Sequence, residues 1–79
     1  MKIKFPQFRR YSNELSYFKI WSEKKFDEYK ITGKKLEKYE FEAKILPDRN
    51  YIHDMLYQYE PYWDLINEEE FNAFIAKHN

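Results

Sequence analysis

The sequence has no cysteine, contains one glycine, and has no apolar run near the ~20 residues that a membrane-spanning helix needs. The absence of cysteine excludes a disulfide framework, a thiol nucleophile and a cysteine-ligated zinc site. A single glycine, Gly33, excludes the glycine-rich loops that cradle the phosphates of nucleotides. Because an apolar leader of the secretory type is not visible either, we expect a cytoplasmic protein that makes no contact with a membrane.

Aromatic and charged side chains are plentiful, and they make up 22% and 35% of the 79 residues. We expect a single domain over residues 1–79, and a domain of this size buries only ~60% of the surface that its unfolded chain exposes. Aromatic side chains, which bury ~150–250 Å² each, can supply the core that disulfides or a metal would otherwise reinforce. Self-association would add further buried area, so a homo-oligomer is also expected.

Opposite charges are separated along the chain although they cancel overall, with 14 Lys and Arg against 14 Asp and Glu. Residues 1–44 hold 12 of the basic residues and 7 of the acidic ones, and residues 45–79 hold the other 2 and 7. This asymmetry fits a basic face for nucleic acid, or a dipolar surface that pairs with another copy. The simpler interpretation is that the two halves neutralise each other within one fold.

Alternating apolar and polar residues predict strands in several regions. The clearest is 38–45, whose odd-numbered residues are apolar and whose even-numbered residues are charged. Residues 15–21 are rich in aromatic and β-branched side chains and are apolar on both faces, which is typical of a central strand. Residues 9–12 are expected to pair with it through a short turn, and a short edge strand is expected at 2–5.

Two helices are predicted from their capping residues. Asn67 precedes Glu70 by three positions, as in a capping box, and the flanking apolar residues fit a hydrophobic staple. The C-terminal helix is therefore expected to begin after Asn67 and to present one apolar stripe. A second helix is expected to begin at Asp48 and to end before Pro61.

Residues 23–29 allow two interpretations. Residues 17–26 and 62–71 share a pattern, an extended segment followed by a Ser or Asn cap and a staple, which favours a short helix over 23–29. The alternative is a hairpin in which 28–31 turns near Gly33 into the next strand. We prefer the helix. The predicted fold is a small α+β domain, an antiparallel sheet of three to four strands packed by two or three short helices including the C-terminal one.

Catalytic residues in a productive arrangement are not visible. Serine occurs at 12, 16 and 22 without a neighbouring histidine that could act as its base. His53 and Asp54 would point about 100° apart on a helix, and the three glutamates at 68–70 would diverge in the same way. We therefore predict that the protein is not an enzyme, and that it has no metal site, no cofactor and no small-molecule substrate.

The basic half of the chain offers a candidate binding surface. On one predicted strand Tyr17, Lys19 and Trp21 share a face, and rings that stack on bases beside a lysine are typical of single-stranded nucleic-acid platforms. The alternative is that Tyr17 and Trp21 pack beneath a helix while the lysine reaches the edge. The candidate surface comprises Arg9, Arg10, Tyr17, Lys19, Trp21, Lys24, Lys25, Lys34 and Lys35.

Two functions are consistent with these observations. The leading hypothesis is a small non-enzymatic interaction or regulatory module that acts through protein–protein contacts, with an unidentified protein or a second copy as its partner. It rests on the absence of catalytic machinery, the single-domain size and the separated charges. The alternative is a nucleic-acid-binding protein that uses the basic, aromatic-interleaved N-terminal half.

Overall fold

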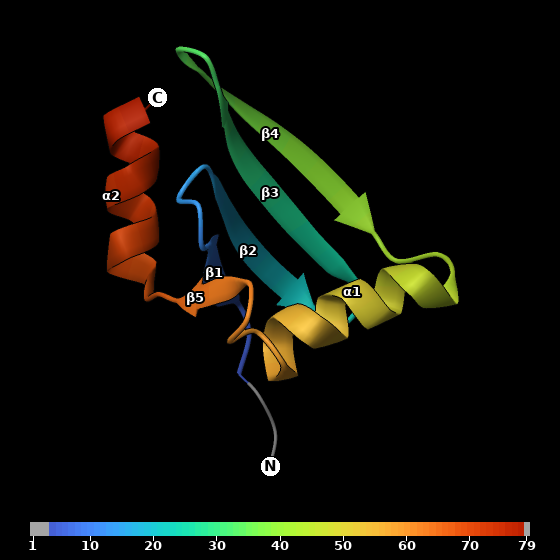
Figure 1. Ribbon diagram of the computed structural model, residues 1–79. Coiled ribbons are helices and arrows are strands. Elements are labelled where there is room, and N and C mark those ends of the chain that lie inside the picture. Colours follow the sequence, from blue (N-terminus) through green and yellow to red (C-terminus); the bar gives the residue numbers. More distant parts are fainter. Residues whose placement is uncertain (1–3, 79) are drawn as a thin grey trace.

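The computed structural model describes residues 4–78. These residues form a five-stranded antiparallel sheet with strand order β4-β3-β2-β1-β5, and two helices (Figure 1). The α+β class and the antiparallel sheet are confirmed, with one strand more than expected. The elements are β1 (Gln7–Tyr11), β2 (Ser16–Ser22), β3 (Lys25–Thr32), β4 (Lys35–Glu42), α1 (Leu46–Tyr57), β5 (Trp63–Leu65) and α2 (Glu68–His78).

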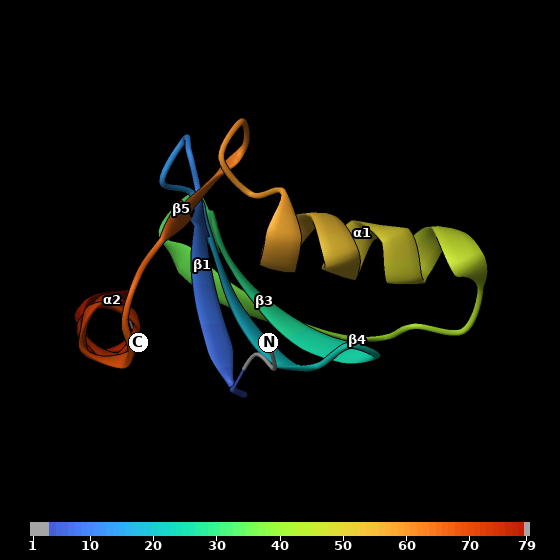
Figure 2. The ribbon, with the colours of Figure 1, turned by 90° about the horizontal axis from the view of Figure 1, so that it is seen from below.

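The two helices lie on opposite faces of the sheet (Figure 2). Successive side chains of a strand point to opposite faces, so β1 and β2 contribute to both layers. This confirms the prediction that residues 15–21 form a central strand, apolar on both sides and paired with β1. The core beneath α1 comprises Phe18, Ile20, Phe26, Ile52, Met55, Leu56 and Trp63. A smaller core beneath α2 comprises Phe8, Ile66 and Phe71.

α2 begins where its capping box predicts. The side-chain oxygen of Asn67 accepts a hydrogen bond from the backbone N–H of Glu70 at 2.8 Å. The carboxylate of Glu70 accepts one from the backbone N–H of Asn67 at 3.5 Å. Phe71 and Phe74 are buried against the sheet, so the predicted apolar stripe is confirmed.

α1 begins at Leu46, two residues before the predicted start at Asp48. Pro47 lies in its first turn, where the missing N–H would have had no partner within the helix. The carboxylate of Asp48 accepts a hydrogen bond from the backbone N–H of Lys44 at 3.2 Å, so it stabilises the start of the helix from inside its first turn. The helix ends well before Pro61, as predicted. Its buried face comprises Ile52, Met55 and Leu56.

The helix predicted over 23–29 is wrong, and the hairpin alternative is correct, because residues 25–32 form β3. Ser22 accepts a hydrogen bond from the N–H of Lys24 at 3.1 Å, but this bond stabilises the turn between β2 and β3. β3 pairs with β2 on one side and with β4 on the other. An extended segment satisfies its backbone groups in two ladders here, whereas a helix would leave β4 without a partner strand and β2 with β1 alone.

The remaining differences concern the bounds of strands. The strand predicted at 38–45 has the correct alternation but lies three residues earlier, at Lys35–Glu42, after a turn in which Gly33 has φ 64°. Residues 4 and 5 of the strand predicted at 2–5 are not in a strand, and 2–3 lie outside the described residues. The extended segment expected at the start of 62–71 forms β5, and its pairing with β1 was not predicted. Within residues 4–78, neither helix is long and apolar enough to cross a membrane.

Candidate interaction surface

Arg9, the first residue of the predicted basic surface, is a core residue. It is 2% exposed, and its guanidinium donates from Nε to the carbonyl oxygen of Met55 at 2.8 Å. It also donates from Nη1 to the carbonyl oxygen of Phe8 at 2.7 Å and lies 4.7 Å from the ring centroid of Tyr59. Burial lowers the pKa of Arg9, and Tyr59 partly offsets this effect. The assignment of Arg9 to an exposed binding surface is therefore wrong.

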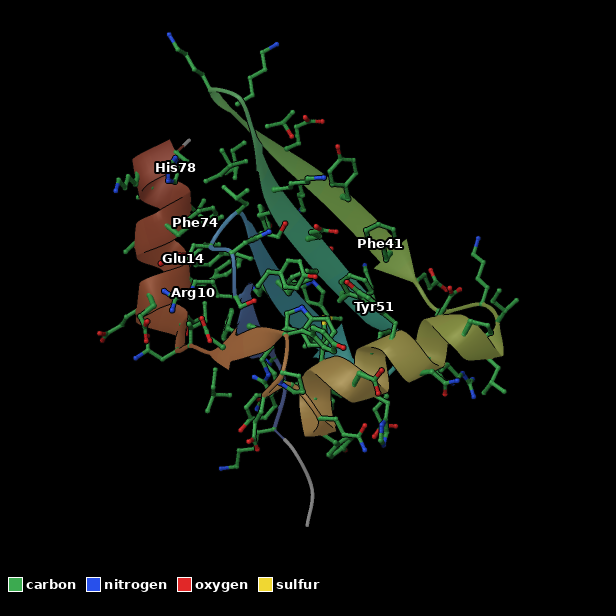
Figure 3. All side chains as sticks on the ribbon, in the orientation of Figure 1. Arg10, Glu14, Phe41, Tyr51, Phe74 and His78 are labelled. Atoms are coloured by element: carbon green, nitrogen blue, oxygen red, sulfur yellow. The ribbon has the colours of Figure 1, made fainter. Side chains whose placement is uncertain are left out.

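Arg10 and Tyr17 lie on the opposite face and are held by neighbouring side chains. Arg10 donates to the carboxylate of Asp64 at 2.9 Å, which raises its pKa, and lies 3.5 Å from the carboxylate of Glu14. Figure 3 shows Arg10 and Glu14 close together. The ring of Tyr17 stacks on Phe74 of α2, with the centroids 3.6 Å apart. Tyr17 therefore packs beneath a helix, which was the alternative to a role in stacking on bases.

Lys19 and Trp21 remain adjacent on this face. The Nζ atom of Lys19 lies 4.1 Å from the centroid of the Trp21 ring, which is 43% exposed. The indole N–H donates to Oδ2 of Asp27 at 2.7 Å, and Nζ of Lys38 lies 4.0 Å from the same oxygen. Asp27 is 3% exposed, and its Oδ1 has no hydrogen-bond partner within residues 4–78. This carboxylate repels a phosphate that approaches the two lysines.

The other four lysines of the predicted surface lie at opposite ends of β3. Lys24 and Lys25 lie where β3 begins, and Lys34 and Lys35 lie at the turn where it ends. β3 has eight residues, so the two ends are separated by about 26 Å at about 3.3 Å per residue. The nine candidate residues therefore do not come together as one surface.

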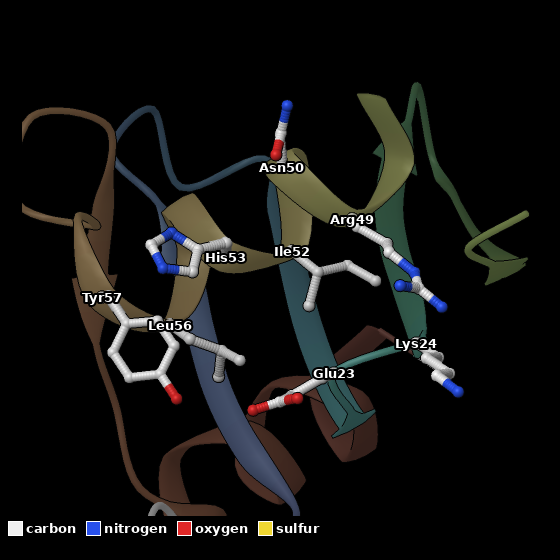
Figure 4. A pocket seen from close by; sticks show the side chains of 8 residues that line it. All are labelled: Glu23, Lys24, Arg49, Asn50, Ile52, His53, Leu56 and Tyr57. Carbon is white, nitrogen blue, oxygen red and sulfur yellow. The ribbon is translucent and has the colours of Figure 1, made fainter. Parts of the chain in front are cut away.

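A hollow of about 230 Å³ lies beside α1 next to Lys24. Figure 4 shows Lys24 and Arg49 toward one end of this hollow and His53 and Tyr57 toward the other, with Glu23 between them. Lys24, Arg49 and Glu23 together give this hollow a net charge of +1, and the carboxylate offsets part of the attraction for an anion. Among the described residues, no three His, Cys, Asp or Glu side chains gather in a way that could hold a metal ion.

A second depression lies beside α1 on the same face of the sheet, and we call it the aromatic groove. It consists of two adjoining hollows of about 340 and 530 Å³ that share Glu28 and Tyr51. Figure 3 shows Phe41 of β4 and Tyr51 of α1 next to each other at the smaller hollow. Its exposed lining comprises Tyr11, Leu15, Phe41, Tyr51 and Tyr62, over a buried floor of Phe18, Phe26 and Trp63.

The groove lies beside α1, which crosses the sheet near the end of β4 (Figure 1), and its smaller hollow lies between this helix and the end of β4. Its five lining side chains are between 36% and 58% exposed. The rings are nevertheless held in place by their neighbours. Phe41 stacks on Phe26 with centroids 4.9 Å apart, and Tyr51 meets Trp63 edge-on at 5.6 Å. The groove is therefore an ordered apolar surface that faces solvent.

Six polar residues also line the groove. Glu28 lies where the two hollows meet, Glu42 and Asp48 line the smaller one, and Asn13, Ser16 and Lys30 line the larger one. Burial raises the pKa of Tyr51 to about 12, and the nearby Glu28 adds to this effect. The indole N–H of Trp63 is buried and has no acceptor within residues 4–78. Aromatic rings around a carboxylate suit an apolar ligand that also carries a donor or a positive charge.

The sequence alone did not point to this groove. The alternation at 38–45 placed Tyr39 and Phe41 on the apolar face of a strand, and the structure leaves them 40% and 43% exposed. An alternating pattern identifies the face of a strand but not the element that covers it. Tyr51, which borders both hollows, is not one of the three buried residues of α1, and no sequence signal distinguished it.

Comparisons with known protein families, with curated proteins and with solved structures gave no match to this chain. The functional interpretation therefore depends on the surface of the protein itself. Of the features described above, the aromatic groove combines exposed rings, a carboxylate and a neighbouring strand edge, so it is the candidate site.

Proposed function

We propose that the protein is a small non-enzymatic interaction module that acts through protein–protein contacts at the aromatic groove. The observation that carries this proposal is the gathering of five exposed apolar side chains on one face, beside α1. Apolar side chains that are exposed singly are normal, whereas a contiguous exposed patch marks a contact surface. Tyrosine is enriched at protein interfaces because its ring buries apolar area while its hydroxyl keeps a polar partner.

An extended polypeptide segment is the kind of partner that suits the groove. The two hollows share Glu28 and Tyr51, so a chain that crosses both can place one side chain in each. Glu28 at their junction favours a lysine, an arginine or another donor between two apolar side chains. The groove also borders β4, an edge strand of the described sheet, to which a polypeptide backbone can add.

The proposal is tested by selecting binders from a library of random peptides displayed on phage, with the folded protein as the target. Amide chemical-shift mapping by NMR then locates the peptide that binds most tightly. We expect the shifted amides to cluster in β4, in the first turns of α1 and around residues 11–15. We also expect the selected peptides to combine aromatic or aliphatic residues with a basic one.

Two tyrosines of α1 provide a matched pair of variants. Tyr51 and Tyr57 are 42% and 47% exposed, but Tyr57 lines the hollow on the other side of the helix. Tyr51→Ser should weaken peptide binding about tenfold or more, whereas Tyr57→Ser should leave it unchanged. Circular dichroism checks that both variants fold. Peptides that map to another surface, or that bind both variants equally, would contradict the proposal.

A nucleic-acid platform is the second candidate, and the adjacent Lys19 and Trp21 are the observation that favours it. It is the weaker candidate, because Arg9 is buried, Arg10 is paired and Tyr17 stacks on α2. Fluorescence anisotropy of labelled single-stranded DNA and RNA tests it at low and high salt. Binding that falls steeply with salt and is lost in Trp21→Ala would favour this candidate, and no binding at low salt would remove it.

A further inference from the structure

β4 presents the long open edge of the sheet. It is the outermost strand next to β3, and no residue within 4–78 pairs with its outer side. The N–H of Ala43, just beyond β4, bonds the carbonyl oxygen of Lys24 at 2.6 Å, and bonded residues alternate along an antiparallel strand. The odd-numbered residues of β4 therefore bond to β3. The backbone groups that point outward belong to Leu36, Lys38, Glu40 and Glu42.

The two edges of the sheet differ in what they offer a partner. β5 has three residues, whereas β4 has eight. Long exposed edges invite pairing with another strand, and charged side chains commonly restrict that pairing. The charges on β4 have both signs, and their order along the strand favours one register.

We propose that β4 pairs antiparallel with β4 of a second copy of this chain, about a two-fold axis at Tyr39, so that the two sheets become one. In this register Lys38 lies opposite the partner's Glu40, and Glu40 lies opposite the partner's Lys38. These residues have outward-pointing backbone groups, so each pair also exchanges backbone hydrogen bonds. Opposite charges directly across two strands stabilise their pairing.

Neighbouring registers oppose like charges. An axis one residue away, at Lys38 or at Glu40, sets that residue against its own copy. An axis at Glu37 places Glu37 opposite its own copy, and an axis at Phe41 places Glu40 opposite the partner's Glu42. Like charges directly opposite one another destabilise a strand pair. An axis that falls between two residues would place each even-numbered residue opposite an odd-numbered one, whose backbone groups already bond to β3. The axis at Tyr39 is therefore the favoured one.

The same register covers aromatic rings on the groove face. Tyr39 lies opposite the partner's Tyr39 and diagonal to the partner's Phe41. Directly opposed Cβ atoms are about 4.5–5.5 Å apart and diagonal neighbours about 7–8 Å, which is within reach of aromatic rings. The pairing deepens the proposed function and rests on it, because it names a second copy as the partner at the β4 side of the groove.

Single cysteines report the register, because the chain has no cysteine of its own. Tyr39→Cys places two thiols at the axis, where the Cα atoms of a non-hydrogen-bonded pair are about 4.5 Å apart, within the range of a disulfide. Phe41→Cys separates them by four positions, about 13 Å along the strands, which is too far. On mild oxidation, Tyr39→Cys should form a disulfide dimer about tenfold faster than Phe41→Cys. A mixture of Glu37→Cys and Phe41→Cys should form the mixed dimer.

Charge-exchange variants test the same pairs without a crosslink, by sedimentation equilibrium. Glu40→Lys opposes two lysines in both charge pairs, and Lys38→Glu opposes two carboxylates, so each should weaken the dimer about tenfold. An equimolar mixture of the two variants restores opposite charges in the mixed dimer and should recover the original dissociation constant. Circular dichroism is the control for folding, because Lys38 also lies 4.0 Å from the buried Asp27.

The outcomes separate this pairing from the proposed function. A chain that stays monomeric at millimolar concentration, or Tyr39→Cys that crosslinks no faster than Phe41→Cys, overturns the pairing. If selected peptides then still bind along the groove, the proposed function stands and its partner is a different polypeptide. If the peptides fail as well, both are wrong.

Discussion

Arg9 of β1 and Met55 of α1 are joined by a buried hydrogen bond of 2.8 Å, from the guanidinium Nε to the backbone carbonyl oxygen. The last carbonyl groups of a helix have no partners within the helix, so a buried helix end needs donors from elsewhere. Arg9 provides such donors and ties the end of α1 to the sheet. Because α1 forms one wall of the aromatic groove, this contact also helps to hold that wall against the sheet.

Replacing Arg9 should therefore destabilise the fold strongly. Arg9→Ala leaves the carbonyl groups of Phe8 and Met55 buried without their donors, and we expect the free energy of unfolding to fall by about 2–4 kcal/mol. Arg10→Ala is the control, because a part-exposed ion pair contributes about 1 kcal/mol or less. Urea denaturation measures both variants, and equal losses would show that burial gives Arg9 no special role.

Trp21 and Asp27 should be energetically coupled. The indole N–H donates to a buried carboxylate at 2.7 Å, and hydrogen bonds to charged groups contribute about 1.5–3 kcal/mol. A double-mutant cycle with Trp21→Phe, Asp27→Ala and the double variant measures this coupling by urea denaturation. Strictly additive losses would show that the bond contributes nothing to stability.

The capping box of α2 gives a prediction with a matched substitution in the same helix. Asn67→Ala removes the acceptor for the N–H of Glu70 and should lower the free energy of unfolding by about 1 kcal/mol. Asn72→Ala, at an exposed position inside the helix, should stabilise the protein by a few tenths of a kcal/mol, because alanine has the higher helix propensity. Thermal melting of both variants checks the sign, and a neutral Asn67→Ala would contradict the cap.

Tyr51 should ionise later than an ordinary tyrosine, because burial raises its pKa to about 12. The native state then keeps this proton at a pH where the unfolded chain has lost it. The protonated Tyr51 side chain therefore makes its full contribution to the free energy of unfolding below about pH 10, and this contribution is lost as the pH rises toward about 12. The ultraviolet absorbance of tyrosinate follows the titration. Tyr51→Phe should remove the component of the absorbance curve that titrates at the highest pH. If that part of the curve is unchanged, the assignment to Tyr51 is wrong.

Several elements follow from chemistry within a few residues. Asn67 and Glu70 cap α2 through groups three positions apart, and the apolar residues on both faces of 15–21 are enough to identify a central strand. The charges on β4 also belong to the sequence, and the register proposed for its edge rests on their order. These features depend on side chains and backbone groups that are close along the chain, so they can be predicted without the rest of the fold.

Contacts between distant segments decided the remainder. Residues 23–29 carry a local pattern that favours a helix, but pairing with strands on both sides holds them extended. Arginine is usually exposed, but Arg9 is buried because the end of α1 covers it and backbone carbonyl groups of that helix accept its hydrogen bonds. The groove is lined by β3, β4, α1, the turn after β1 and the residues at the start of β5, which are far apart along the chain. Burial and strand pairing between distant segments outweigh local helix and strand propensities of about 1 kcal/mol. A local sequence pattern carries no information about these long-range contacts.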